Sequence, residues 1–299
     1  MIPTFPQFKK LELSDRSDVE KITDDFLPYS DFHFPSLYSW DTVGFMGISK
    51  FRQNLVVRFS DYLTSELFLS FTGVDKVDLL ARQLIRSAEK LNTESTLKLI
   101  PYDTAKLLNK DIFRIEEDKD HCDYIYSVDD LISYHGSRLK THRNSLSSFK
   151  RKHHHCQISV AQIDLQNKDQ SDRVFRLHDK WESNKGFIVH QETAALRRYL
   201  DAVRDFEYIC IGVFIDGRLA GFNINSIATR GYANCMFSNG DTNHYGIYSF
   251  LMNESAKFLK EIGFKFINFE QDLGIFNLRK AKEAFKPFHF LKKYRVNLR

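Results

Sequence analysis

Apolar residues along the chain fall into two series that have the same order of elements. The first series has a short apolar run, a glycine, a helically spaced segment and a second run: Leu67–Phe71, Gly73, residues 75–91 and Leu97–Ile100. The second series repeats this order: Ala233–Phe237, Gly240, residues 248–261 and Phe264–Phe269. In each series the glycine precedes the second run by 24 residues. A strand, a helix and a strand in this order predict a right-handed crossover between parallel strands, so we expect two α/β units.

Further elements lie upstream of the second series. Residues 191–204 have helical spacing, and Asp216-Gly217 separates the apolar runs Cys210–Ile215 and Leu219–Ile227. An Asp-Gly pair between such runs predicts a hairpin, because glycine readily adopts the positive φ of a tight turn. Helix, hairpin, strand, glycine turn, helix and strand is the element order of the acetyltransferase-like fold.

The length of 299 residues suits two domains of roughly 100–200 residues each. We therefore predict an α/β protein with mixed sheets, built from two tandem acetyltransferase-like domains. The first, residues 1–130, is expected to be structural or acceptor-binding, and the second, residues 131–299, to hold the active cleft. The longest apolar stretch, Tyr208–Ile215, has about eight residues, whereas a membrane-spanning helix needs about 18. The N-terminus lacks the pattern of a signal peptide, so we expect a cytoplasmic protein without an integral membrane segment.

Positive charge is concentrated in two segments. Residues 131–163 contain six Lys or Arg and no acid, and residues 276–299 contain eight Lys or Arg with Glu283 as their only acid. The chain as a whole has a net charge of +4, so the remainder is acidic overall. Local positive fields of this kind attract polyanions, although a solvated basic face that aids solubility is the alternative.

The C-terminal basic segment begins within a recognisable motif. The motif reads Asn268-Phe-Glu-Gln-Asp272-Leu-Gly274-Ile-Phe-Asn-Leu278-Arg279-Lys-Ala-Lys282 and ends in Phe285-Lys-Pro287. Together with Arg143-Asn144 and Leu37-Tyr38-Ser39-Trp40, it resembles the catalytic domain of phosphatidylglycerol lysyltransferases. The resemblance covers almost the whole chain. It implies transfer of an aminoacyl group from aminoacyl-tRNA, with no cofactor, to an amine or hydroxyl of a lipid, a peptide or a small molecule. Gln271 stands where this family leads us to expect an acid.

Candidate catalytic residues lie in the middle of this motif. Aminoacyl transfer starts from an activated ester, so the enzyme mainly has to hold the reactants, polarise a carbonyl and move one proton. The period of two in a strand places Asn268 and Glu270 on one face, where both can meet one ligand. Glu270 is the candidate to orient the α-amino group of the donor or to accept the proton of the acceptor, and Asp272 follows beyond the strand end. The alternative for Glu270 is an acid satisfied by a neighbouring Lys or Arg.

Candidate phosphate-binding residues lie in the two basic segments. A helix from about Asn277 would place Arg279, Lys282 and Lys286 along one stripe, with Leu278, Ala281 and Phe285 facing inward. An amphipathic helix over Ser137–His153 is expected to join the two domains and to contribute three more candidates: Lys140, Arg143 and Asn144. If this helix neutralises six phosphates, the log–log slope of tRNA binding against salt is about −5. Ordinary solvated helices are the alternative for both segments.

Two other functions stay open. An acyl-CoA-dependent N-acyltransferase would hold the CoA pyrophosphate at a glycine turn before a helix. Gly246 fits that turn, but Tyr248 occupies a position that requires a small residue, so we expect CoA less than tRNA. A non-catalytic module that binds tRNA or a nucleotide on the same fold is the third possibility.

The cysteine and histidine pattern favours neither a metal site nor a covalent nucleophile. The four cysteines lack paired spacing. The consecutive residues His153–Cys156 cannot all face one ion. His121-Cys122-Asp123 are neighbours in sequence, whereas catalytic partners are normally brought together by the fold, so we expect Cys122 to be buried.

Overall fold

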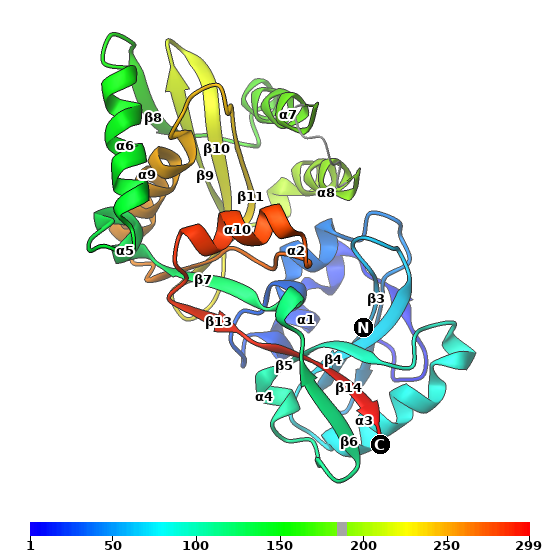
Figure 1. Ribbon diagram of the computed structural model, residues 1–299. Coiled ribbons are helices and arrows are strands. Elements are labelled where there is room, and N and C mark those ends of the chain that lie inside the picture. Colours follow the sequence, from blue (N-terminus) through cyan, green and yellow to red (C-terminus); the bar gives the residue numbers. More distant parts are fainter. Residues whose placement is uncertain (184–189) are drawn as a thin grey trace. The chain divides into compact units, whose positions relative to one another are not determined.

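The computed structural model describes residues 1–183 and 190–299 (Figure 1). The chain divides into two compact units, and neither is continuous in sequence. Unit 1 comprises residues 1–123, 271–276 and 290–299, and unit 2 comprises residues 124–270 and 277–289. The chain therefore passes into unit 2 after Asp123, rather than at the predicted division between residues 130 and 131, and it returns twice to unit 1. The architecture is mixed α/β in several sheets, as predicted.

Unit 1 contains two small sheets. One has the strand order β1-β2-β3-β4 and the other the order β5-β14-β6. The strands are β1 (Lys9–Lys10), β2 (Gly47–Phe51), β3 (Asn54–Ser60), β4 (Leu67–Thr72), β5 (Leu97–Pro101), β6 (Phe113–Glu117) and β14 (Lys293–Leu298). The α-helices are α1 (Arg16–Thr23), α2 (Phe34–Ser39), α3 (Val77–Ser87) and α4 (Tyr102–Ala105).

The first predicted crossover differs from the expectation of one parallel sheet. β4 and β5 flank α3 as predicted, but they belong to different sheets: β4 pairs with β3, and β5 pairs with the C-terminal strand β14. The apolar face of α3 packs against both sheets, in a core that includes Leu80, Leu97 and Val296. Val296, almost 200 residues beyond Leu97 in sequence, is fully buried in this core. This long-range pairing explains why the C-terminal strand belongs to unit 1.

Unit 2 is built on the largest sheet, whose strand order is β13-β7-β12-β11-β10-β9-β8. Its strands are β7 (Asp123–Ser127), β8 (Ile158–Gln162), β9 (Tyr208–Ile215), β10 (Arg218–Ile227), β11 (Tyr232–Gly240), β12 (Phe266–Asn268) and β13 (His289–Leu291). Its helices are α5 (Val128–Ser133), α6 (Lys140–Lys152), α7 (Lys168–Ser183), α8 (His190–Asp201), α9 (Ile247–Glu261) and α10 (Phe276–Ala284). The first residue of β7, the last two of β13 and the first of α10 belong to unit 1.

The second predicted crossover and the hairpin are confirmed in unit 2. β11 and β12 flank α9 and pair in parallel. β9 and β10 pair antiparallel around Asp216 and Gly217, whose φ values of 49° and 74° are those of a tight primed turn. α9 and α6 cover one face of the sheet, and α7 and α8 cover the other (Figure 1). Of the helices in residues 1–183 and 190–299, none combines the length and the apolar character that crossing a bilayer requires.

The predicted joining helix is not a linker. It begins at Lys140 and lies wholly within unit 2, where Phe149 stacks on Phe250 of α9 at a ring-centroid distance of 4.6 Å. The apolar stripe that predicted an amphipathic helix is therefore used to pack α6 onto α9.

Candidate functional site

Two parallel strands of unit 2 part beside the predicted carboxylate. β11 pairs with β12 from Tyr232 to Asn234, and the last pair joins Asn234 to Asn268. β11 continues to Gly240, whereas β12 ends at Asn268. The observed strand β12 is therefore shorter than the predicted strand, residues 264–269. In the pairing of β10 with β11, a register shift accommodates Met236 as an extra residue. Bulges of this kind re-aim neighbouring side chains and are common beside active sites.

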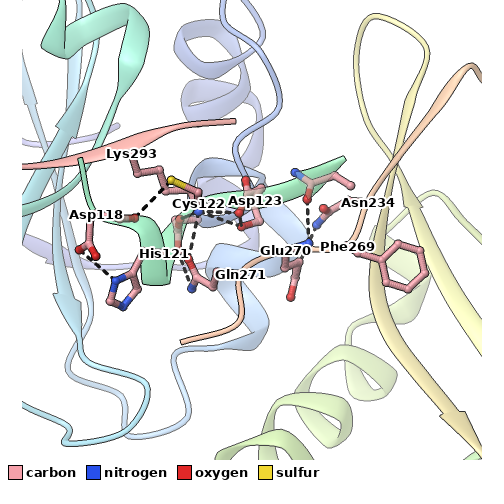
Figure 2. A network of polar contacts seen from close by, with 12 residues as sticks. Asp118, His121, Cys122, Asp123, Asn234, Phe269, Glu270, Gln271 and Lys293 are labelled. Carbon is pink, nitrogen blue, oxygen red and sulfur yellow. Dashed lines mark hydrogen bonds and ion pairs between the residues drawn. The ribbon is translucent and has the colours of Figure 1, made fainter. Parts of the chain in front are cut away.

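Hydrogen bonds with Asn268, Tyr124 and Asn234 hold Glu270 at this point. Its backbone N–H donates to Oδ1 of Asn268 at 2.7 Å, and its carbonyl accepts from the N–H of Tyr124 at 3.0 Å. The amide nitrogen of Asn234 donates to Oε1 of Glu270 at 3.2 Å, and Figure 2 shows the two side chains pointing toward one another. Asn234 and Asn268 are fully buried, whereas Glu270 is half-buried. The buried amide of Asn234 therefore orients the carboxylate, the buried amide of Asn268 holds the backbone, and the Glu270 side chain is partly open to solvent.

The backbone of Glu270 is in the left-handed region, with φ of 55°. A non-glycine residue seldom adopts this conformation, which costs about 1–2 kcal/mol. The alternation that predicted Asn268 and Glu270 on one strand face therefore ends at Asn268. The two side chains still come together, because the Asn268 amide turns the chain by bonding to the N–H of Glu270.

Lys282 supports the same segment from α10. Its ammonium group donates to the carbonyl of Phe269 at 2.5 Å and lies 5.8 Å from the ring centroid of Tyr124. The Lys282 carbonyl accepts from the hydroxyl of Tyr126 at 2.7 Å. The predicted inward face of this helix is only partly observed, since Leu278 is half-buried, Phe285 packs against the core and Ala281 is exposed. Lys282 thus holds the residue that precedes Glu270, a role that its predicted place in a phosphate-binding stripe did not include.

Asp272 is a turn residue of unit 1. Its buried carboxylate accepts the N–H of Gly274 at 2.8 Å, and its carbonyl accepts the N–H of Ile275 at 2.9 Å. These bonds close the turn that begins α10.

Gln271, where an acid was expected, joins a buried charge cluster of unit 1. Its Oε1 accepts from the ammonium of Lys293 at 3.0 Å, and its Nε2 donates to Asp31 at 3.2 Å. Lys293 also bonds to Asp31. It bonds to Asp123 at 2.6 Å (Figure 2). A carboxylate at position 271 could accept from Lys293 but could not donate to Asp31. Burial by itself would lower the pKa of Lys293, but the carboxylates of Asp123 and Asp31 raise it above its usual value, so the lysine stays charged.

Several C-terminal cations are neutralised within unit 1. Lys293 is fully buried, Lys292 pairs with Glu117 at 2.8 Å, and Arg295 pairs with Asp118 at 2.7 Å. From the sequence we predicted that these residues form part of an anion-binding patch. Their acidic partners lie about 170 or more positions away in sequence, so the neutralisation was not visible there. The basic C-terminal segment is thus divided, and only residues 277–289 belong to unit 2.

α6 and the segment that follows α10 are in contact in unit 2. The ring of His142 stacks on Phe285 with centroids 3.7 Å apart, and its Nδ1 bonds to the hydroxyl of Ser249 at 2.9 Å. Burial lowers the pKa of His142, and the adjacent Lys286 lowers it further. Lys140, two residues before His142, and Lys286, directly after Phe285, are both exposed. This ring contact brings part of the two predicted basic segments together.

The other candidates on α6 differ in their surroundings. Arg143 donates to the carbonyls of Tyr134 at 2.6 Å and Gly136 at 3.1 Å, so it fixes the turn before the helix. Asn144 is exposed.

Gly246, the predicted phosphate contact, lies against the backbone of α6. Its φ is 89°, and a Cβ at this position would lie 2.5 Å from the carbonyl oxygen of Ser145. Nearby, Nε2 of His153 bonds to Nδ1 of His244 at 2.9 Å. The close approach of the Ser145 carbonyl explains why position 246 requires glycine, and this packing against α6 accounts for Gly246 without a phosphate ligand.

Among the described residues, the cysteines and histidines show neither a metal-binding group nor an activated thiol. In the part of the chain that the structure describes, no three His, Cys, Asp or Glu side chains are grouped so as to hold a metal ion. Cys122 is buried as predicted, and burial raises the pKa of its thiol to about 11, which disfavours the nucleophilic thiolate.

Sequence reasoning missed Asn234 and Lys293. The available signal for Asn234 was its polar side chain within the otherwise apolar run Tyr232–Phe237. For Lys293 the sequence contains no comparable signal, because it lies among other lysines and arginines.

Comparison with known proteins gives one family and a shared fold. The family described as phosphatidylglycerol lysyltransferase, C-terminal, matches residues 30–297. The sequence has no significant match among curated proteins.

Solved structures with a similar fold cover nearly the whole chain. A conserved protein of unknown function from Bacteroides thetaiotaomicron has a TM-score of 0.83 and 23% identity, with 100% of both chains covered. L-PGS from Bacillus licheniformis has a TM-score of 0.64 and 15% identity, covering 97% of this chain and 93% of that one. The C-terminal domain of a putative lysylphosphatidylglycerol synthetase from Agrobacterium fabrum has a TM-score of 0.61 and 14% identity, covering 94% and 92%.

Proposed function

Because the chain belongs to the family of phosphatidylglycerol lysyltransferase C-terminal domains, we propose that it transfers an aminoacyl group from aminoacyl-tRNA to an amine or hydroxyl acceptor. Family membership supports an acyl or aminoacyl transferase. The proposal adds the tRNA donor, the acceptor classes of a lipid headgroup, a peptide or a small molecule, and a tandem acetyltransferase-like architecture.

The observation that carries the proposal is the oriented carboxylate of Glu270. In the proposed reaction, the acceptor oxygen or nitrogen attacks the ester carbonyl carbon of the donor. A new C–O or C–N bond forms, the ester bond to the tRNA ribose breaks, and Glu270 carries the acceptor proton toward the leaving ribose oxygen. Asn234 keeps the carboxylate in one orientation, and the bonds of Asn268 and Lys282 keep its backbone in place. Because the ester is already activated, positioning and one proton transfer are the main requirements.

The tRNA backbone is proposed to contact the exposed cations near the His142–Phe285 contact. Lys140 and Lys286 are the principal candidates, and Arg279 and Asn144 are the further candidates on α10 and α6. Replacing Lys140 and Lys286 by alanine should reduce the log–log salt slope of tRNA binding by about 1–2. Replacing Lys292, which is paired with Glu117, should leave the slope unchanged.

Glu270→Gln tests the catalytic role. Wild type and variant are incubated with tRNA charged with labelled amino acids and with phosphatidylglycerol vesicles or primary amines as acceptors. We expect the variant to lose about 10²–10⁴-fold in transfer rate while its affinity for tRNA stays unchanged. Glu261→Gln, which alters an exposed acid at the end of α9, is the matched control and should transfer normally.

Other outcomes would point to the alternatives. Binding of tRNA without turnover for any donor and acceptor would support a non-catalytic module. Stabilisation of the wild-type protein against heat by acetyl-CoA, with no effect of charged tRNA, would support an acyl-CoA enzyme.

A further inference from the structure

A row of aromatic rings crosses one end of the sheet in unit 2. Tyr232 of β11 lies 4.9 Å from Phe266 of β12, and Phe266 lies 5.5 Å from Phe288, measured between ring centroids. His289 of β13 completes the row, and its Nε2 bonds to the hydroxyl of Tyr232 at 3.3 Å. Ile267, which alternates with Phe266, packs into the core beneath α9. The row therefore lies on the face of the sheet opposite α9.

Exposure increases along this row. Tyr232 is 6% exposed, Phe266 and His289 are half-buried, and Phe288 is 60% exposed. Tyr232 is thus the buried end of the row, and Phe288 is its solvent-exposed end.

Each segment that supplies a ring also supplies an exposed cation. Arg230 is two residues from Tyr232, Lys265 precedes Phe266, and Lys286 is two residues before Phe288. The segments 228–232, 264–266 and 285–289 contain no Asp or Glu. Aromatic rings interleaved with cations are typical of surfaces that bind single-stranded nucleic acid, since bases stack on the rings and phosphates meet the cations. A purely apolar partner would instead have to bury or displace these charges at a cost.

We propose that this row, Tyr232, Phe266, Phe288 and His289, stacks unpaired nucleobases at the single-stranded end of the donor RNA. The inference rests on the proposed function. Phe266 and Asn268 lie on the same face of β12, two residues or about 6.6 Å apart along the strand. A base stacked on Phe266 would therefore lie next to Asn234 and Asn268, the residues whose amides hold Glu270.

The test uses a labelled six-nucleotide single-stranded RNA and a duplex RNA of equal length, with binding followed by fluorescence anisotropy. The full-length variants are Phe288→Ala, Phe288→Leu and Phe288→Trp. Phe45→Ala is the matched control, because Phe45 of unit 1 is 59% exposed. Phe288→Ala and Phe288→Leu should each weaken binding of the single strand about fivefold to a hundredfold. Phe288→Trp and Phe45→Ala should bind like the wild type, and no variant should change duplex binding.

Leucine separates stacking from apolar contact. Wild-type affinity of Phe288→Leu for the single strand would overturn the proposal, and so would the absence of single-strand binding by the wild type. If Phe288→Ala impaired flotation with phosphatidylglycerol vesicles and left RNA binding unchanged, the face would bind lipid and the proposal would be wrong.

The assay contains no aminoacyl donor or acceptor, so its result is independent of transfer. Phe288-dependent RNA binding without turnover would contradict the proposed function and still support the stacking surface. Normal turnover together with unchanged RNA binding by Phe288→Ala would support the proposed function and overturn the stacking surface.

Discussion

The amide nitrogen of Asn234 donates a hydrogen bond of 3.2 Å to Oε1 of Glu270, at the place in unit 2 where β11 and β12 part. Asn234 is the last residue of β11 that is paired with β12, and its side chain is fully buried. Because the Asn234 amide is neutral, this hydrogen bond orients the carboxylate without adding a charge beside it. This arrangement suits a group that must accept a proton during transfer.

Replacing Asn234 by aspartate should make the transfer reaction depend on higher pH. Two carboxylates at this separation repel, so the pKa of the pair rises and Glu270 is protonated over a wider range. We expect the acidic limb of the kcat profile to move upward by at least one pH unit. Asn234→Ala removes the hydrogen bond without adding charge, so it should lower kcat and move the limb upward by less than Asn234→Asp does. Identical pH profiles for the two variants would contradict this role of Asn234.

Replacing Gly246 by alanine should destabilise the packing of α6 on α9. The new Cβ would lie 2.5 Å from the Ser145 carbonyl oxygen and 3.1 Å from Cβ of Phe149, so backbone must shift. We expect a loss of about 1–3 kcal/mol in the free energy of unfolding, measured by urea denaturation. Gly263→Ala is the control, because Gly263 has a similar φ of 95° and nothing within 4 Å of the added carbon. Equal losses in the two variants would show that backbone strain alone, not contact with α6, is responsible.

Replacing Lys293 by methionine should strongly destabilise the protein. The carboxylates of Asp31 and Asp123 would stay buried without their cation, which typically costs about 3–5 kcal/mol. The neighbouring Lys292→Met removes only a partly exposed pair with Glu117, so it should lower the free energy of unfolding much less than Lys293→Met does. Urea denaturation of both variants measures the difference. A small effect of Lys293→Met would mean that the buried cluster contributes little to stability.

Asp118 should make stability fall in acid. Burial alone would raise its pKa, but hydrogen bonds from His121 and Arg295 outweigh burial and lower the pKa to about 2. The unfolded value is about 3.9, so this stabilisation is present above about pH 4 and is lost as pH falls toward 2. The stability difference between wild type and Asp118→Asn should therefore shrink over this window, as measured by urea midpoints. A difference that stays constant from pH 5 to 2 would be inconsistent with a lowered pKa.

Local patterns in the sequence predicted much of unit 2. Helical spacing located α9, and the Asp216-Gly217 pair located the β9–β10 hairpin. Glycine at position 240 and the following helix predicted the parallel crossover from β11 to β12. Each of these signals depends on residues close in sequence, since periodicity and turn chemistry act over a few positions.

The sequence alone also singled out Glu270 and its neighbour Asn268, because a polar face at a strand end is visible as alternation. Only the tertiary structure revealed that Asn234 orients Glu270, that Lys282 holds Phe269, and that β14 crosses back to unit 1, where Lys293 becomes a buried cation. Those relationships join residues 13 to 262 positions apart. A partner at such a separation is selected by which surfaces pack together, and no local spacing encodes that choice.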